Sequence, residues 1–189
     1  MGHGVTERWN RQAAEQALDV LAFNAKNAAL ARYWLSLWDG DTPPARSALN
    51  PAHMKEMLPG VAILDCRPDE ELRCRLAGSA LVAGAGIELK GQDLVALTPP
   101  AFRRQRLGRS SQVVRGAMSR RHQQYRTRTG EDALVEDIQL PLSGVGEDGT
   151  RSILFHADWR PLTLDRRMGE IIDGFDIAVG AEFFSLVSI

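Results

Sequence analysis

Residues 11–38 contain neither glycine nor proline, and this long run requires a fold that can cover an extended helix. Its apolar side chains recur at helical spacing: Ala14, Leu18, Leu21, Ala25, Ala28, Tyr33, Trp34, Leu37 and Trp38. Asn10 is the expected N-cap, residues 39–44 (DGDTPP) end the helix, and Asn24 and Asn27 mark a kink or a division into two helices. Because such a helix is unstable alone, its stripe must rest on a sheet or on a second copy of the chain.

Five strands are predicted next, at residues 61–66, 72–77, 119–129, 133–142 and 151–160; the first is a short apolar run, and polar and apolar residues alternate in the second. Helical turns are expected at residues 51–57 and 78–91, with a longer helix in the second half of 101–118. This order predicts an α+β domain with a five-stranded antiparallel sheet, helices on one face and the long N-terminal helix.

The chain divides into three parts. Residues 1–40 form the N-terminal helix, which caps the sheet or dimerises, and residues 41–161 form the core. Residues 162–189 are too apolar to remain in solvent and are expected to dock on the core or on a dimer mate. Leu18, Leu21, Tyr33, Trp34 and Trp38 are the candidates for the cap or a homodimer interface.

The composition excludes several classes of protein. The sequence contains no window of 18 uncharged apolar residues, so no membrane-spanning helix is expected, and the N-terminus lacks the apolar core of a secretory signal. Two cysteines, Cys66 and Cys74, cannot form a disulfide scaffold or a four-thiolate metal site. These features together lead us to expect a cytoplasmic protein. There is no Walker motif, no Gly-x-Ser-x-Gly and no triad, so we expect no catalytic residues.

Short motifs occur in a characteristic order between residues 28 and 161. They are Tyr33-Trp34, Pro43-Pro44-Ala45-Arg46, Asn50-Pro51, Leu58-Pro59, Ile63-Leu64-Asp65, the run from Arg73 to Ser79, the run from Gly86 to Gly91, and the run from Glu136 to Leu142. Together they resemble the PAS family of sensory domains, and within it a bacterial subfamily that begins with a Trp-containing helix. Asn50 departs from that subfamily, which often has Asp there, and we expect no output domain after the core.

The resemblance implies that the sheet bends around the helix before Met118 and encloses a pocket for a small molecule. The implied pocket residues are Phe102, Arg103, Arg106, Leu107, Val114, Met118, Tyr125, Leu140, Phe155 and Trp159. The expected function is that of a non-enzymatic sensor that binds a small molecule and signals through a protein partner. The alternative is a ligand-free dimeric adaptor whose core is packed solid.

Cofactors and metals are disfavoured. The helix at 101–118 contains no His to ligate haem, and alternation places His122 and His156 on the outer face of the sheet. Neither Cys66 nor Cys74 lies in the helical motif that flavin photochemistry uses. His156 and Asp158 share a strand face, but no second pair completes a metal site.

Basic residues are concentrated in one segment. Residues 101–130 contain nine arginines and no acid, whereas the rest of the chain has 14 basic and 24 acidic residues. A helical wheel places Arg103 and Arg106 among apolar residues, and Arg104, Arg109 and Arg115 on a solvated face. We expect Arg103 and Arg106 to bind the anionic group of a ligand.

Two alternatives for Arg103 and Arg106 need no ligand. Gly108 breaks the helix and leaves both arginines in solvent, or they pair with Glu88, Asp93 or Glu136. Nucleic-acid binding by the segment is a third function, which the scarcity of stacking aromatics (Phe102 and Tyr125 alone) makes unfavourable.

Overall fold

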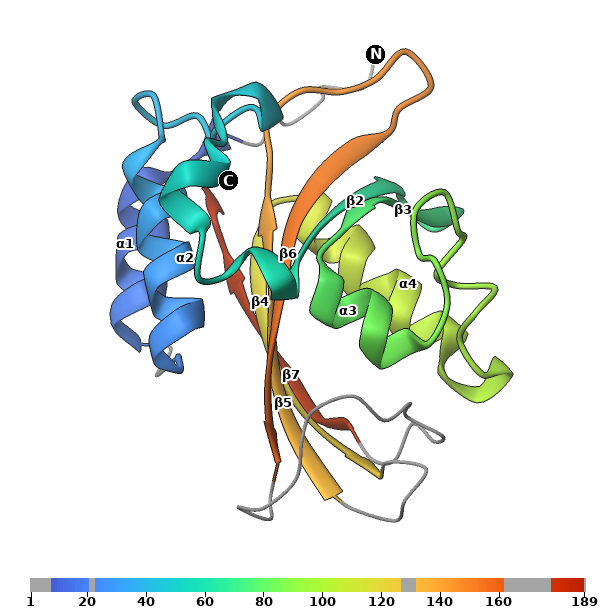
Figure 1. Ribbon diagram of the computed structural model, residues 1–189. Helices are drawn as coiled ribbons and strands as arrows, with labels where there is room; N and C mark the ends of the chain where they lie inside the picture. Colours follow the sequence, from blue (N-terminus) through green and yellow to red (C-terminus); the bar gives the residue numbers. More distant parts are fainter. Residues whose placement is uncertain (1–7, 21–22, 127–131, 162–177, 189) are drawn as a thin grey trace.

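The computed structural model describes residues 8–20, 23–126, 132–161 and 178–188 (Figure 1). A six-stranded antiparallel sheet has the strand order β3-β2-β6-β5-β4-β7. Its strands are β2 (Val61–Arg67), β3 (Glu71–Ala77), β4 (Ala117–Arg126), β5 (Asp132–Pro141), β6 (Arg151–Pro161) and β7 (Ala178–Ser185). The predicted α+β class is confirmed, with a sheet one strand larger than the five expected.

Helices lie on both faces of this sheet (Figure 1). The helices are α1 (Arg11–Val20), α2 (Ala25–Ser36), α3 (Ser79–Ala85) and α4 (Pro100–Val114), and the 3-10 turns are η1 (Arg46–Ala48), η2 (Pro51–Met54) and η3 (Leu58–Gly60). Among these helices, none combines the length and hydropathy that crossing a membrane requires.

The N-terminal segment forms two helices, which is the alternative that Asn24 and Asn27 left open beside one long helix. The Asn10 side chain accepts a hydrogen bond from the Ala13 N–H (3.0 Å) and caps α1. Asn24, in extended conformation, accepts one from the Asn27 N–H (2.9 Å) and begins α2. A carboxamide that caps the backbone competes with helix continuation, so the chain divides at the asparagine.

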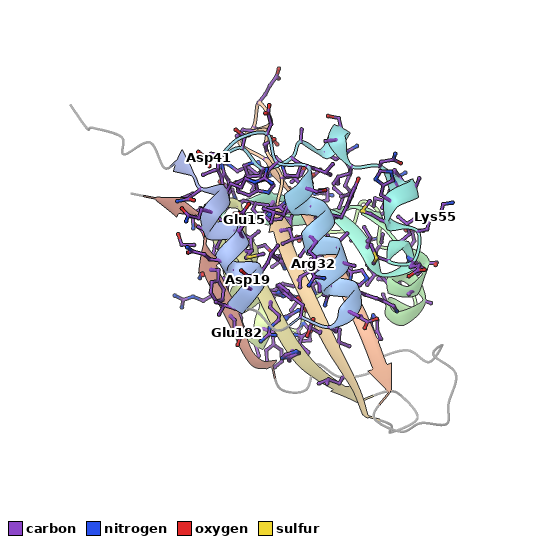
Figure 2. The ribbon with its side chains drawn as sticks, turned by 90° about the vertical axis from the view of Figure 1, so that its left-hand side faces the viewer. Glu15, Asp19, Arg32, Asp41, Lys55 and Glu182 are labelled. Atoms are coloured by element: carbon purple, nitrogen blue, oxygen red, sulfur yellow. The ribbon has the colours of Figure 1, made fainter. Side chains whose placement is uncertain are left out.

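The outer face of the sheet is covered by α1 and α2. Glu15, Asp19 and Arg32 point to solvent (Figure 2), while Trp34 is fully buried and donates from its indole N–H to the Pro141 carbonyl (2.8 Å). Trp38 packs edge-to-face against Trp34, with ring centroids 5.1 Å apart. Leu18 and Tyr33 border this core, and Leu21 lies outside the described residues.

The C-terminal extension adds an edge strand. Residues 178–185 form β7, which pairs with β4, whereas 162–177 lie outside the described part of the chain. Beyond β7, Leu186 is fully buried; its N–H donates to Gly116 O (2.6 Å) and its carbonyl accepts from the Asn10 N–H (2.7 Å). Two short strands, β1 (Arg8–Trp9) and β8 (Val187–Ser188), then pair with each other, so both ends of the described chain meet beside α1.

The inner face carries α3 and α4. The longer helix, α4, runs without a break through Gly108 and packs against β2, β4, β5 and β6. Val113 and Val114, at the end of α4, belong to a second apolar core together with Leu64, Leu72 and Ile153. The sheet therefore has two buried faces, each with its own core.

Candidate functional site

A cavity of about 310 Å³ lies between α3, α4, the segment joining them and the inner face of the sheet. Its wall is mainly apolar: Ala62, Leu64, Leu72, Cys74, Leu81, Gly84, Ala85, Ile87, Leu89, Leu94, Leu97, Val135, Phe155, Ala157 and Trp159. Five polar side chains complete the lining: Arg106, Arg109, Arg121, Asp137 and Gln139. Alternation along β5 and β6 explains the set, because every second residue of a strand faces the same side.

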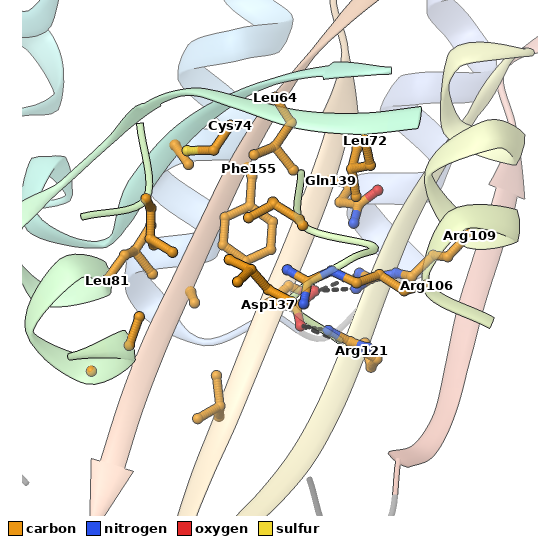
Figure 3. Close-up of a pocket in the computed structure, with 18 of the residues that line it drawn as sticks. Leu64, Leu72, Cys74, Leu81, Arg106, Arg109, Arg121, Asp137, Gln139 and Phe155 are labelled. Carbon is orange, nitrogen blue, oxygen red and sulfur yellow. Dashed lines mark hydrogen bonds and ion pairs between the residues drawn. The ribbon is translucent and has the colours of Figure 1, made fainter. Parts of the chain in front are cut away.

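Asp137 is the centre of the polar lining (Figure 3). It is 2% exposed, and its Oδ2 accepts from Nε (3.0 Å) and Nη2 (2.8 Å) of Arg121. Its Oδ1 forms an ion pair with Arg109, which is itself 4% exposed. Burial alone would raise the pKa of Asp137, but the two guanidiniums outweigh it and hold that pKa below its ordinary value. Asp137 is therefore a carboxylate shared by two arginines.

Neutral polar groups fix the orientation of this cluster. The Arg109 Nε–H donates to Ser119 Oγ (2.8 Å), and the Ser110 hydroxyl donates to Gln139 Oε1 (3.1 Å). Arg106, one turn before Arg109 on α4, donates from Nη1 to the Thr98 hydroxyl (3.0 Å). Asp137 thus pairs with the guanidiniums of Arg109 and Arg121, and Arg106 lines the same cavity from α4.

The structure brings part of the expected pocket set together. Arg106, Phe155 and Trp159 line the cavity, and Leu107 and Val114 belong to the core under α4. Phe102 is half-buried outside the lining, and the Tyr125 side chain lies outside the described residues.

Two expected pocket residues lie on the other face of the sheet. Leu140 and Met118 are buried in the core beneath α1 and α2, so their assignment to the cavity is wrong. On β5 the residues that alternate with Leu140 face inward, and these include Asp137 and Gln139. The sequence carried a signal for them, since two polar residues alternate with Ile138, Leu140 and Leu142.

Two arginine assignments also change. Arg103 donates from Nε to Thr98 O (2.8 Å) and from Nη2 to Ala96 O (3.1 Å), and it is not among the described lining residues. Arg109, expected in solvent, is buried against Asp137. Because α4 continues through Gly108, Arg106 and Arg109 fall one turn apart on the face toward the sheet.

The outer face holds a separate polar network. His156 Nδ1 lies 2.5 Å from Asn27 Oδ1, and Asn27 Nδ2 donates to the backbone carbonyl (3.0 Å) and Oε1 (2.8 Å) of Glu136. Glu136 Oε2 lies 2.8 Å from His122 Nε2 and Oε1 accepts from the Asn24 N–H (2.9 Å). Both imidazoles face away from the cavity, as the alternation predicts.

Metal ligation finds no support in the described part of the chain, where no three His, Cys, Asp or Glu side chains are placed to hold an ion. Asp158, which shares a strand face with His156, pairs with Lys26 (2.9 Å). Both cysteines are buried: burial raises the pKa of Cys66 to about 11 and also raises that of Cys74. Both thiols therefore stay protonated near neutral pH.

A family model described as a PAS domain matches residues 22–153, more than half of the chain. The chain belongs to the PAS domain family. The resemblance seen in the sequence is confirmed, and the match covers α2 through the start of β6 of this PAS domain. Strand β7 lies beyond the match. Neither a curated protein nor a solved structure matches the chain.

Proposed function

We propose that this PAS domain is a non-enzymatic sensor that binds a small molecule in the inner-face cavity and signals through a protein partner. The family supports a sensory or signalling module. The observation that carries the ligand-binding part is the cavity of about 310 Å³, which falls at the lower end of the range for small-molecule sites. The alternative, an adaptor with a solid core, does not account for this cavity.

The arrangement of β5 supports a route from the cavity to α2. Asp137 faces the cavity, whereas its neighbour Glu136 faces outward and is hydrogen-bonded to Asn24 and Asn27. A ligand that displaces Asp137 therefore acts on the strand that holds the start of α2. Signalling requires that the ligand favour one position of this helix over another.

The proposal includes the homodimer expected from the sequence. Trp34 and Trp38 are buried within the domain, so their side chains are not available to contact a second copy of the chain. The exposed faces of α1 and α2, which carry Glu15, Asp19 and Arg32, remain accessible (Figure 2).

Nucleic-acid binding is left out of the proposal because of the pairing of the arginines. Arg109 and Arg121 share Asp137, Arg115 pairs with Asp69, and Arg120 pairs with Glu182. An arginine held by a carboxylate contributes less to phosphate binding than one in solvent.

Native mass spectrometry of the purified protein tests the sensor. We expect a bound mass that disappears on denaturation. Ala157→Leu fills the cavity from β6 and should abolish the bound mass, whereas Ala29→Leu on the exposed side of α2 should retain it. A wild-type protein that carries no bound mass, and takes up none from a small-molecule cell extract, would favour the adaptor.

A further inference from the structure

We propose that the ligand is a small amphipathic carboxylate whose anionic group binds Arg106 and Arg121 and whose apolar body lies against Leu64, Leu81 and Phe155. This inference rests on the proposed function, because it names the class of molecule that the same cavity binds. It differs from the expectation made from the sequence, which paired Arg106 with Arg103.

The charges of the lining favour an anion. Among the described residues that line the cavity, three are arginines and one, Asp137, is an acid, which leaves two positive charges in excess. Three arginines against one acid attract an anion into the cavity and repel a cation. A carboxylate can accept charge-assisted hydrogen bonds from these guanidiniums.

The donor geometry identifies which arginines are suited to the ligand. Arg109 directs Nε to Ser119 and Nη1 to Asp137, so it supports the cluster. Arg121 directs Nε and Nη2 to the same oxygen of Asp137, and its remaining nitrogen, Nη1, belongs to a side chain that lines the cavity. Arg106 reaches the lining from α4 and is hydrogen-bonded to the neutral hydroxyl of Thr98. Figure 3 shows Arg109 and Arg121 joined to Asp137 by dashed lines, with Arg106 and Phe155 among the other lining residues.

Size and wall chemistry limit the rest of the ligand. A volume of about 310 Å³ accommodates roughly ten groups the size of a water molecule. Leucines, Phe155 and Trp159 make most of the wall, so most of those groups must be apolar. Inorganic phosphate has no apolar part that could pack against this wall.

Three probes of similar length separate the alternatives: octanoate, 1-octanol and octylamine, each titrated into the full chain by calorimetry at pH 7. We expect octanoate to bind about tenfold or more tighter than 1-octanol, because charge-assisted hydrogen bonds add to the shared apolar contact. Octylamine should bind most weakly. Equal binding of octanoate and 1-octanol, preference for octylamine, or tight binding of inorganic phosphate would each overturn the carboxylate assignment.

A pair of variants on α4 tests the role of Arg106. Arg106→Gln retains a donor for Thr98 and should weaken octanoate by about tenfold or more while leaving 1-octanol unchanged. Arg104→Gln, on the exposed side of the same helix, should change neither. Unchanged octanoate binding by Arg106→Gln would contradict the assignment.

Ala157→Leu distinguishes failure of this inference from failure of the proposed function. Suppose that octanoate does not bind, and that 1-octanol or octylamine binds the wild type but not Ala157→Leu. The cavity is then a binding site for another class of ligand. If Ala157→Leu weakens none of the probes that bind, binding occurs outside the cavity and the proposed function loses its support. If none of the three probes binds, the carboxylate assignment is wrong, and native mass spectrometry decides the sensor separately.

Discussion

His156 is deeply buried, although an imidazole in water titrates near neutral pH. It is 1% exposed, and burial lowers its pKa from 6.5 to about 4, with Lys26 adding to the decrease and Asp158 and Glu136 opposing it. The imidazole is therefore neutral in the folded protein at pH 7, and because Asn27 Nδ2 donates to Glu136, Asn27 Oδ1 is the acceptor for a proton on His156 Nδ1. In the unfolded chain the same imidazole takes up a proton below pH 6.5.

The free energy of unfolding should consequently decrease on mild acidification. The contribution of His156 is complete above pH 6.5 and is lost between pH 6.5 and about 4, by up to about 3 kcal/mol. Asp137, whose pKa is lowered from 3.8, acts only at more acidic pH, so the two effects separate. Urea unfolding at a series of pH values measures the slope.

The variant His156→Asn keeps a donor near Nδ1 and should flatten the slope between pH 6.5 and 4. The matched control is His53→Asn, at an exposed imidazole on η2, which should leave the slope as it is in the wild type. A slope that persists in His156→Asn would mean that another group is responsible.

At the scale of elements, α2 is held to the sheet by polar as well as apolar contacts. Asn27 is fully buried and joins His156 on β6 to Glu136 on β5. Asn27→Ala leaves these groups without their partner, and we expect it to lower the free energy of unfolding by about 3 kcal/mol. Arg32→Ala, on the solvent side of the same helix, should change it by about 0.5 kcal/mol or less.

Chemical denaturation measures both α2 variants. If Asn27→Ala costs no more than Arg32→Ala, the network does not hold the helix, and the proposed route from β5 to α2 loses its physical basis. Cavity binding of octanoate is unaffected by that outcome, because Asn27 lies on the other side of the sheet.

The strands were predictable because alternation and turn residues are local. The five expected segments correspond to β2 through β6, with bounds that differ by only a few residues. Alternation also separated Phe155 and Trp159 from His156 correctly. It did not decide which set of β5 faces the cavity, because both faces of the sheet are covered and the more apolar set, with Leu140, lies beneath α2.

The buried charges depended on contacts that no local pattern contains. Arg109 appears solvated on a helical wheel, and its burial is favourable only because Asp137, on another element, balances it. Arg121 on β4 likewise pairs with Asp137, a residue of another strand. Sequence reasoning found the arginine-rich helix and one lining arginine, Arg106, and missed the carboxylate that Arg109 and Arg121 share.

At the scale of the whole molecule, the C-terminal segment completes the outer core. Leu186 is fully buried beside α1, and Phe184 packs against the same core. Leu186→Ala should lower the free energy of unfolding by about 2–5 kcal/mol, as expected for a buried leucine. Leu76→Ala, at a leucine that is 51% exposed on β3, should cost about 0.5 kcal/mol.

Thermal and urea unfolding of these two leucine variants gives the comparison. Similar losses for Leu186→Ala and Leu76→Ala would show that the segment after β7 contributes little to the folded state. A large loss for Leu186→Ala alone would make this segment, which lies beyond the family match, part of the folding unit.

The pairing of β1 with β8 has a consequence for synthesis of the protein. Asn10, which caps α1, donates its N–H to the Leu186 carbonyl, so α1 waits for a partner that is synthesised 176 residues later. At about 5–20 residues per second, that delay is on the order of ten seconds or more. During this interval the apolar side of α1 and α2 has no completed sheet to cover, and we expect chaperones to bind it then.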